Sequence, residues 1–190
     1  MMTLHGFAAS NYYNLVKHAL LYKELPFKEN LIYPTSEALL AISPAGKVPV
    51  LTTLDGLNIS ESSVICDFIE ETYPEIALYP ANASERAIVR QIMKMAELYF
   101  ELPSRRLIPY AFTGTEAPES VKAEVRQVLA RGITGLNRLC QFSPWVAGEQ
   151  FTMADIYLYY VNTIVSAFGS SQLNWDVLAE VAGMKPWNDS

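Results

Sequence analysis

Three short stretches near the N-terminus combine residue types that can take part in ligand chemistry. Ser10 stands between a predicted strand and a predicted helix, where a hydroxyl can cap the helix or donate a hydrogen bond to a ligand. Pro49 opens another predicted strand and removes one backbone donor from its ladder. Glu61 and Ser62 precede a further helix, whose positive end can bind an anion. Helix caps and a turn-to-strand proline are the ordinary structural explanations for the same residues.

The elements that must position these residues follow the order β-α-β-α-β-β-α. Short apolar runs predict strands, and apolar residues repeated at helical spacing predict helices. The predicted strands are 3–7, 27–33, 48–53 and 57–59, and the predicted helices are 11–23, 36–42 and one that follows Ser62. In this last helix, one side is predicted to carry Val64, Ile65, Phe68, Ile69 and Thr72.

The second half of the chain has a different pattern: its apolar residues recur at helical spacing, and no segment convincingly predicts a strand. The spacing predicts helices at 86–102, 119–140 and 155–168, and the last of these is apolar almost all round. Proline, asparagine and small residues without periodicity predict a linker at 79–85. We therefore expect an α/β domain at 1–78, this linker, and an all-helical domain at 86–190.

Composition excludes several classes of function. The 190 residues are 51% hydrophobic and carry a net charge of −6, which argues against nucleic acid as a partner. Two histidines, and two cysteines outside any C-x-x-C pair, predict that there is no metal site. No apolar run is long enough to span a membrane, and the N-terminus lacks a secretory pattern. These features predict a cytoplasmic protein.

The order of elements, with a proline opening the third strand and a helical domain behind it, resembles the cytosolic glutathione transferase family. The resemblance covers nearly the whole chain and implies a thioredoxin-like N-terminal domain followed by an all-α helical bundle. Residues 43–51 are similar to the family signature N-P-x-G-K-V-P-x-L, with Ser43 in place of Asn. Thr152 and Asp155 match its S/T-x-x-D element at the start of a core helix, where they form a structural capping box.

The resemblance implies a glutathione site in the first domain. The Val48–Pro49 bond is expected to be cis, which turns the Val48 backbone outward so that glutathione pairs with it like an added strand. Lys47 precedes this pair within the signature. Ser62 is expected to bind the γ-glutamyl carboxylate at the helix start, and Glu61 is expected to meet the ammonium group.

The family's activating residue is expected at Ser10. In the serine-type and cysteine-type classes this residue lies six positions before an apolar helix residue that aligns with Val16. Family members often have proline two residues after it, where this chain has Tyr12. Asn11, Tyr12 or Tyr13 are therefore alternatives for the group that contacts the thiol.

The resemblance implies a transferase that uses glutathione as co-substrate, without a tightly bound cofactor, to attack a small hydrophobic electrophile between the domains. The expected pocket walls are Phe7, Tyr12, Tyr13, Tyr99, Arg106 and Tyr110, and Arg105 or Arg106 is a candidate carboxylate contact. A homodimer is expected. The sequence stops where most members of the family continue into a last helix. A glutathione-dependent oxidoreductase is an alternative, weakened by the absence of cysteine at position 10. A non-catalytic interaction module is another, weakened by the presence of Lys47, Val48, Pro49, Glu61 and Ser62.

Overall fold

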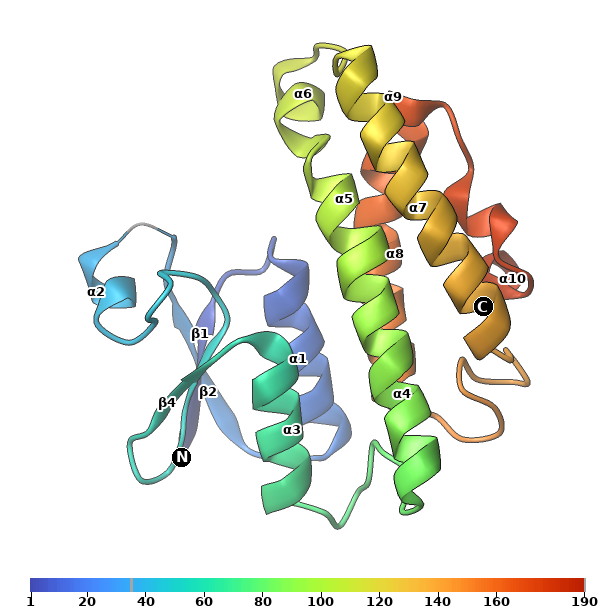
Figure 1. The fold of residues 1–190 in the computed structure, drawn as a ribbon. Coiled ribbons are helices and arrows are strands. Elements are labelled where there is room, and N and C mark those ends of the chain that lie inside the picture. Colours follow the sequence, from blue (N-terminus) through green and yellow to red (C-terminus); the bar gives the residue numbers. More distant parts are fainter. Residues whose placement is uncertain (35, 190) are drawn as a thin grey trace. The chain divides into compact units, whose positions relative to one another are not determined.

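The computed structural model describes residues 1–34 and 36–189 and divides the chain into two compact units, Met1–Leu78 and Tyr79–Ser190 (Figure 1). The helix that opens the second unit, α4, begins at Ala83, with Asn82 as its cap. The Asn82 side chain accepts hydrogen bonds from the backbone N–H groups of Ser84 and Glu85. The predicted linker 79–85 is therefore wrong at its C-terminal end, because its last residues are the first turn of α4.

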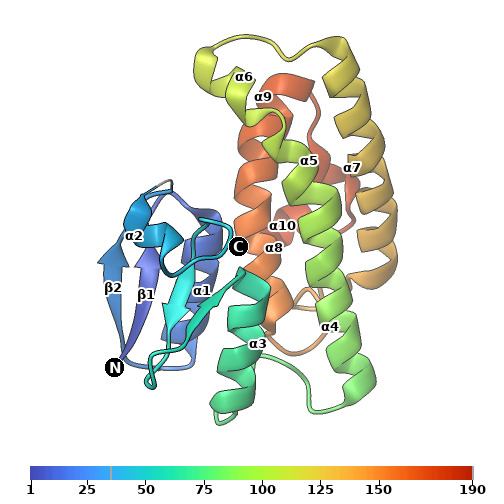
Figure 2. The same ribbon diagram turned by 60° about the vertical axis from the view of Figure 1, so that its left-hand side comes forward.

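The first unit is a mixed four-stranded sheet in the order β2-β1-β3-β4, as expected for a thioredoxin-like domain (Figure 2). β1 pairs with β2 in parallel, and β3 is antiparallel to both β1 and β4. Its strands are β1 (Met2–Gly6), β2 (Phe27–Leu31), β3 (Val50–Thr52) and β4 (Asn58–Ser60). Its helices are α1 (Asn11–Tyr22), α2 (Glu37–Leu40) and α3 (Ser62–Thr72). The predicted fold class and order of elements are confirmed.

The burial of α1 and α3 follows their sequence periodicity except at Val64 and Thr72 of α3, which are both exposed. In α1, Leu15, Val16, Ala19 and Leu20 are buried, as their spacing predicts. In α3 the buried residues are Ser62, Ile65, Cys66 and Ile69. The prediction that Val64 faces the core is wrong, because its side chain is 51% exposed. The buried positions follow an i, i+3, i+4, i+7 stripe, and Val64 lies outside it.

The second unit is helical, as predicted. Its longest elements pack together, with α4 in contact with both α7 and α8. The helices are α4 (Ala83–Ala96), α5 (Leu102–Arg105), α6 (Ile108–Thr113), α7 (Glu119–Leu139), α8 (Met153–Ile164), α9 (Ser170–Leu173) and α10 (Met184–Asn188). A π-helical turn, Glu97–Glu101, joins α4 to α5, and another, Val165–Gly169, joins α8 to α9. A 3₁₀ turn occupies Val177–Glu180.

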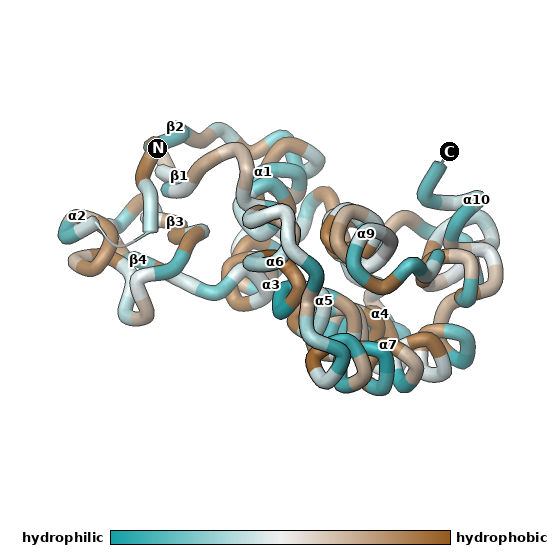
Figure 3. The backbone as a smooth tube through the Cα atoms, turned by 90° about the horizontal axis from the view of Figure 1, so that it is seen from above, coloured by the Kyte–Doolittle hydropathy of each residue, from teal (hydrophilic) through white to brown (hydrophobic). Residues whose placement is uncertain are grey.

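Residue size and buried hydrogen bonds fix the packing of this unit. Hydrophobic and hydrophilic residues alternate along α7 (Figure 3). A Cβ at Gly132 of α7 would lie 2.7 Å from the Phe100 ring, so only glycine permits this approach. Asp155 of α8 accepts hydrogen bonds from the backbone N–H groups of Thr152 and Val146, each at 2.8 Å. The S/T-x-x-D element therefore performs its expected structural role.

Among the described residues, no helix combines the length and apolar character needed to cross a membrane.

Candidate functional site

The strand register brings the three sequence-predicted stretches of the first unit to one end of the sheet. His5 of β1 pairs with Val50 of β3, so the beginning of β3 lies beside the end of β1. Val50 in turn pairs with Ser60, so the end of β4 lies beside the same point. α1 follows β1 and α3 follows β4. The starts of both helices and the segment before β3 are therefore neighbours in the fold.

The segment before β3 presents an unused backbone edge. The Val48–Pro49 peptide bond is cis, as predicted. No hydrogen bond among the described residues uses the N–H or C=O of Val48. Lys47, whose side chain is exposed, is held by the buried Ser43 through both of its backbone polar groups. The Ser43 hydroxyl accepts from Lys47 N–H at 3.0 Å and donates to its carbonyl at 2.8 Å. Serine thus fixes this turn where the family signature has asparagine.

Glu61 enters α3 in an unusual backbone conformation. Its φ of 68° and ψ of 113° are rare for a residue with a side chain and cost about 1–3 kcal/mol. Its carbonyl accepts the first helical hydrogen bond, from Ile65 N–H at 2.9 Å. Its exposed side chain does not cap the helix. The capping explanation therefore does not hold for Glu61, whose carboxylate is presented beside Ser62, the buried first residue of α3.

Ser10 caps α1 with its side-chain oxygen, and its hydroxyl proton remains available to donate a hydrogen bond. Its Oγ accepts from Tyr13 N–H at 3.3 Å, and its own N–H donates to the Phe7 carbonyl at 3.0 Å. Among the described residues, no acceptor takes the Ser10 hydroxyl proton. Ser10 can therefore cap the helix and donate to a ligand at the same time.

The three alternatives to Ser10 are already engaged with other groups. Tyr13 is 3% exposed, and its hydroxyl donates to Glu29 of β2. Burial, reinforced by the Glu29 carboxylate, raises the pKa of Tyr13 far above its usual value. Asn11 is buried and Tyr12 is half-buried, and each has an interaction partner. These contacts favour Ser10 over its neighbours, and the Tyr13 hydroxyl is directed to the sheet.

The residues predicted to line an electrophile pocket are divided between the two units. In the first unit, Phe7 stacks on Tyr33, with ring centroids 5.4 Å apart. Tyr33, which follows β2, was not among the predicted pocket residues. The second unit carries Tyr99 in the first π-helical turn, Tyr110 in α6, and Arg106. Arg106 Nη2 lies 2.6 Å from Glu124 Oε2, and Arg105 Nε lies 2.6 Å from Glu101 Oε1.

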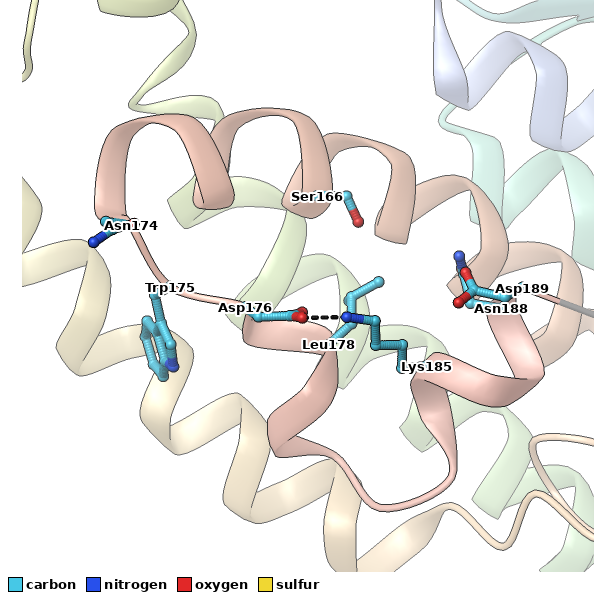
Figure 4. A pocket seen from close by; sticks show the side chains of 8 residues that line it. All are labelled: Ser166, Asn174, Trp175, Asp176, Leu178, Lys185, Asn188 and Asp189. Atoms are coloured by element: carbon cyan, nitrogen blue, oxygen red, sulfur yellow. Dashed lines mark hydrogen bonds and ion pairs between the residues drawn. The ribbon is translucent and has the colours of Figure 1, made fainter.

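A separate polar cavity of about 390 Å³ lies in the second unit (Figure 4). Lys185 and Asp176 form an ion pair across it. Its lining residues are Ser166, Asn174, Trp175, Asp176, Leu178, Lys185, Asn188 and Asp189. None of the sequence-predicted site residues is among them, so this cavity is distinct from the candidate site.

Comparison with known proteins assigns the family. Residues 4–77 match the family described as glutathione S-transferase, N-terminal domain. A glutathione S-transferase from Pseudomonas putida strain F1 is 45% identical over 181 residues, covering 95% of this chain and 82% of the relative. The chain belongs to the glutathione S-transferase family. The resemblance inferred from the sequence motifs is therefore confirmed.

The chain is also similar to a more distant relative and to a solved structure. A maleylacetoacetate isomerase from Dictyostelium discoideum is 28% identical, covering 75% of this chain and 69% of the relative. The crystal structure of a glutathione S-transferase from Methylobacterium radiotolerans, in complex with glutathione sulfonate, has a TM-score of 0.81. It is 24% identical and covers 99% of this chain and 88% of its own. This structural likeness extends over both units.

Proposed function

We propose that this protein is a glutathione transferase that stabilises the thiolate of glutathione for attack on a hydrophobic electrophile. One observation carries the proposal. The hydroxyl of Ser10, the unused backbone of Val48, and the carboxylate of Glu61 beside Ser62 meet at one end of a single sheet. Membership of the glutathione S-transferase family supports the same function.

In the proposed complex, the backbone of glutathione binds to the end of the sheet as an additional short strand. The N–H and C=O of Val48 pair with the peptide, since protein groups do not use them. The γ-glutamyl carboxylate lies at the start of α3 beside Ser62, where the helix dipole favours an anion. Glu61 binds the ammonium group, and Lys47 adds positive charge near the other end of the peptide. These contacts hold glutathione with its sulfur near Ser10.

Ser10 activates the sulfur by donating a hydrogen bond to the thiolate. A free thiol with a pKa of about 8.5 is only about 3% ionised at pH 7. Lowering its pKa by about two units requires about 2.7 kcal/mol of selective stabilisation of the anion. A charge-assisted hydrogen bond and the N-terminal dipole of α1 together supply energy of this order. The sulfur then bonds to the electrophilic carbon, and the leaving group departs with the electrons of the broken bond.

The chemistry of the two cysteines opposes a rival oxidoreductase that uses a protein thiol. Burial raises the pKa of Cys66 far above its usual value and that of Cys140 to about 12. A thiol with so high a pKa forms almost no thiolate near neutral pH. This supports glutathione, rather than a protein thiol, as the source of the nucleophilic sulfur.

Glutathione binding tests the proposed function. Calorimetric titration should show saturable binding of one glutathione per chain. Glu61→Gln should weaken the affinity about three- to fivefold, the typical effect of losing one exposed ion pair. Glu71→Gln, at an exposed position near the other end of α3, is the control and should leave the affinity unchanged. Absence of binding by the unmodified chain, or equal affinities for all three proteins, would contradict the proposed site.

We also propose that the chain forms a homodimer. Large apolar side chains stay exposed along the continuous helix formed by α4, its π-helical turn and α5. They include Ile88, Leu98 and Leu102, at 38%, 49% and 47% exposure. We infer that these side chains contribute to an interaction surface. Because the family resemblance implies a homodimer, we infer that a second copy of the chain covers these side chains.

Light scattering tests the homodimer. The expected mass is about twice the 21.2 kDa of one chain. Leu98→Glu should shift the mass towards the monomer, because a charge placed in an apolar interface is costly. Leu21→Glu, at an exposed position on α1, should not change the mass. A purely monomeric unmodified chain at micromolar concentration would exclude this assembly.

A further inference from the structure

Three side chains connect the first two turns of α1 to β2. The Tyr13 hydroxyl donates to Glu29 Oε2, and Lys17 Nζ lies 2.8 Å from both Glu29 oxygens. Tyr13 and Lys17 are one helical turn apart, so both reach the same carboxylate. The hydrogen bond from Lys17, followed by that from Tyr13, holds the pKa of Glu29 below its usual range. Glu29 is therefore a carboxylate that accepts from both residues at neutral pH.

The ring of Tyr13 is also fixed against the last residue of β1. A Cβ placed on Gly6 would lie only 2.3 Å from Tyr13 Cδ2, so the ring rests directly on the glycine backbone. Tyr13 is 3% exposed. The side chain is thus held by β1 through packing and by β2 through its hydroxyl. This contact sets the distance between the first turn of α1 and the sheet.

The same residue holds the Ser10 hydroxyl. Tyr13 N–H donates to Ser10 Oγ at 3.3 Å, which occupies one lone pair and restricts the directions left to the hydroxyl proton. Asn14 reinforces the arrangement from the next position. Its backbone N–H donates to the Ser10 carbonyl at 3.0 Å, and its side chain donates to the Ala8 carbonyl at 2.8 Å.

We propose that Tyr13, Glu29 and Lys17 are positioning residues for Ser10. They hold its hydroxyl at the place where it donates to the glutathione thiolate, and this inference rests on the proposed function. None of the three needs to touch the sulfur, since Tyr13 acts through its hydrogen bond to Ser10 Oγ. Two exposed alanines, Ala8 and Ala9, precede Ser10 and provide no comparable anchor. A directional hydrogen bond from a loop residue requires such support, because it weakens steeply when misaligned.

A double-mutant cycle tests the inference, with the apparent pKa of bound glutathione as its readout. The pKa is measured from the thiolate absorbance of the complex as pH is varied. Ser10→Ala should raise it by about one unit and Tyr13→Phe by about half a unit, as expected for the loss and the loosening of one charge-assisted hydrogen bond. The double variant should match Ser10→Ala alone, because the anchor acts only through Ser10. Tyr22→Phe, near the other end of α1, is the control and should cause no shift.

The outcomes separate this inference from the function on which it rests. An unchanged pKa in Ser10→Ala would contradict the proposed role of Ser10. A shift in Ser10→Ala with none in Tyr13→Phe would overturn only the positioning role, even if thermal unfolding showed that Tyr13→Phe is less stable. The positioning role would also be overturned if Tyr13→Phe raised the apparent pKa of bound glutathione by the same amount in the unmodified chain and in Ser10→Ala. Tyr13 would then act independently of Ser10.

Discussion

Lys23→Met is expected to lower the free energy of unfolding by about 3–5 kcal/mol, the typical cost of removing one partner of a buried ion pair. The Lys23 side chain is 1% exposed at the C-terminal cap of α1. Its Nζ lies 2.7 Å from Glu70 Oε2 and 2.6 Å from the Ile76 carbonyl. Glu70 also accepts from Leu78 N–H at 3.1 Å. The substitution would leave a largely buried carboxylate and a carbonyl without their ammonium partner.

Urea unfolding of the variants measures this cost. The matched control is Lys94→Met, which removes an i, i+3 pair with Glu97 in which the lysine is 52% exposed. It should cost less than about 1 kcal/mol, as surface ion pairs do. Adding Glu70→Met to Lys23→Met should recover part of the loss, because the buried carboxylate is then gone as well. Similar losses for Lys23→Met and Lys94→Met would refute the role assigned to the buried pair.

Ser10→Ala is expected to reduce kcat/KM for conjugation of glutathione to an activated aryl halide about tenfold at pH 6. The reduction follows from an increase of about one unit in the pKa of the bound thiol, which lowers the thiolate fraction tenfold where pH is below both pKa values. A more basic thiolate is a better nucleophile and recovers a small part of the loss. Above about pH 9.5 both enzymes hold glutathione as thiolate, so their rates should converge.

The pH dependence distinguishes activation of the thiol from a general loss of binding. The glutathione Kd of Ser10→Ala should stay near that of the unmodified enzyme, since Val48, Glu61 and Ser62 are unchanged. Ser10→Thr keeps a hydroxyl at the helix cap and should retain more activity at pH 6 than Ser10→Ala. A loss of equal size at every pH would assign Ser10 a purely structural role as the cap of α1.

The sequence was sufficient to predict the order of elements, because apolar periodicity and turn residues are local signals. It also indicated Ser10, Val48 and Glu61, since each lies beside the boundary of a predicted element. It failed at Val64 and Thr72, which are exposed although they were predicted to share one side of the helix with Ile65 and Ile69. Apolar spacing alone did not determine which edge of that side met the sheet.

Contacts between distant elements could not be predicted from local signals. Lys23 is the last residue of a predicted helix, where a cation usually interacts with the helix dipole in solvent. Its buried partner, Glu70, is 47 residues away. Tyr13 and Glu29 are 16 residues apart and meet only because β2 pairs with β1, the strand that α1 contacts. A tyrosine in the first turn of a helix gives no sign of that anchor until the strand order is known.

The most direct test of the glutathione transferase account is the ionisation of glutathione bound to the unmodified protein. The thiolate absorbance of the saturated complex is followed from pH 5 to pH 10, with free glutathione titrated in parallel. The account predicts an apparent pKa of about 6.5 for the bound thiol, about two units below that of a free thiol. A complex that binds glutathione but ionises near pH 8.5 would contradict it, because Ser10 and α1 would then give the thiolate no stabilisation.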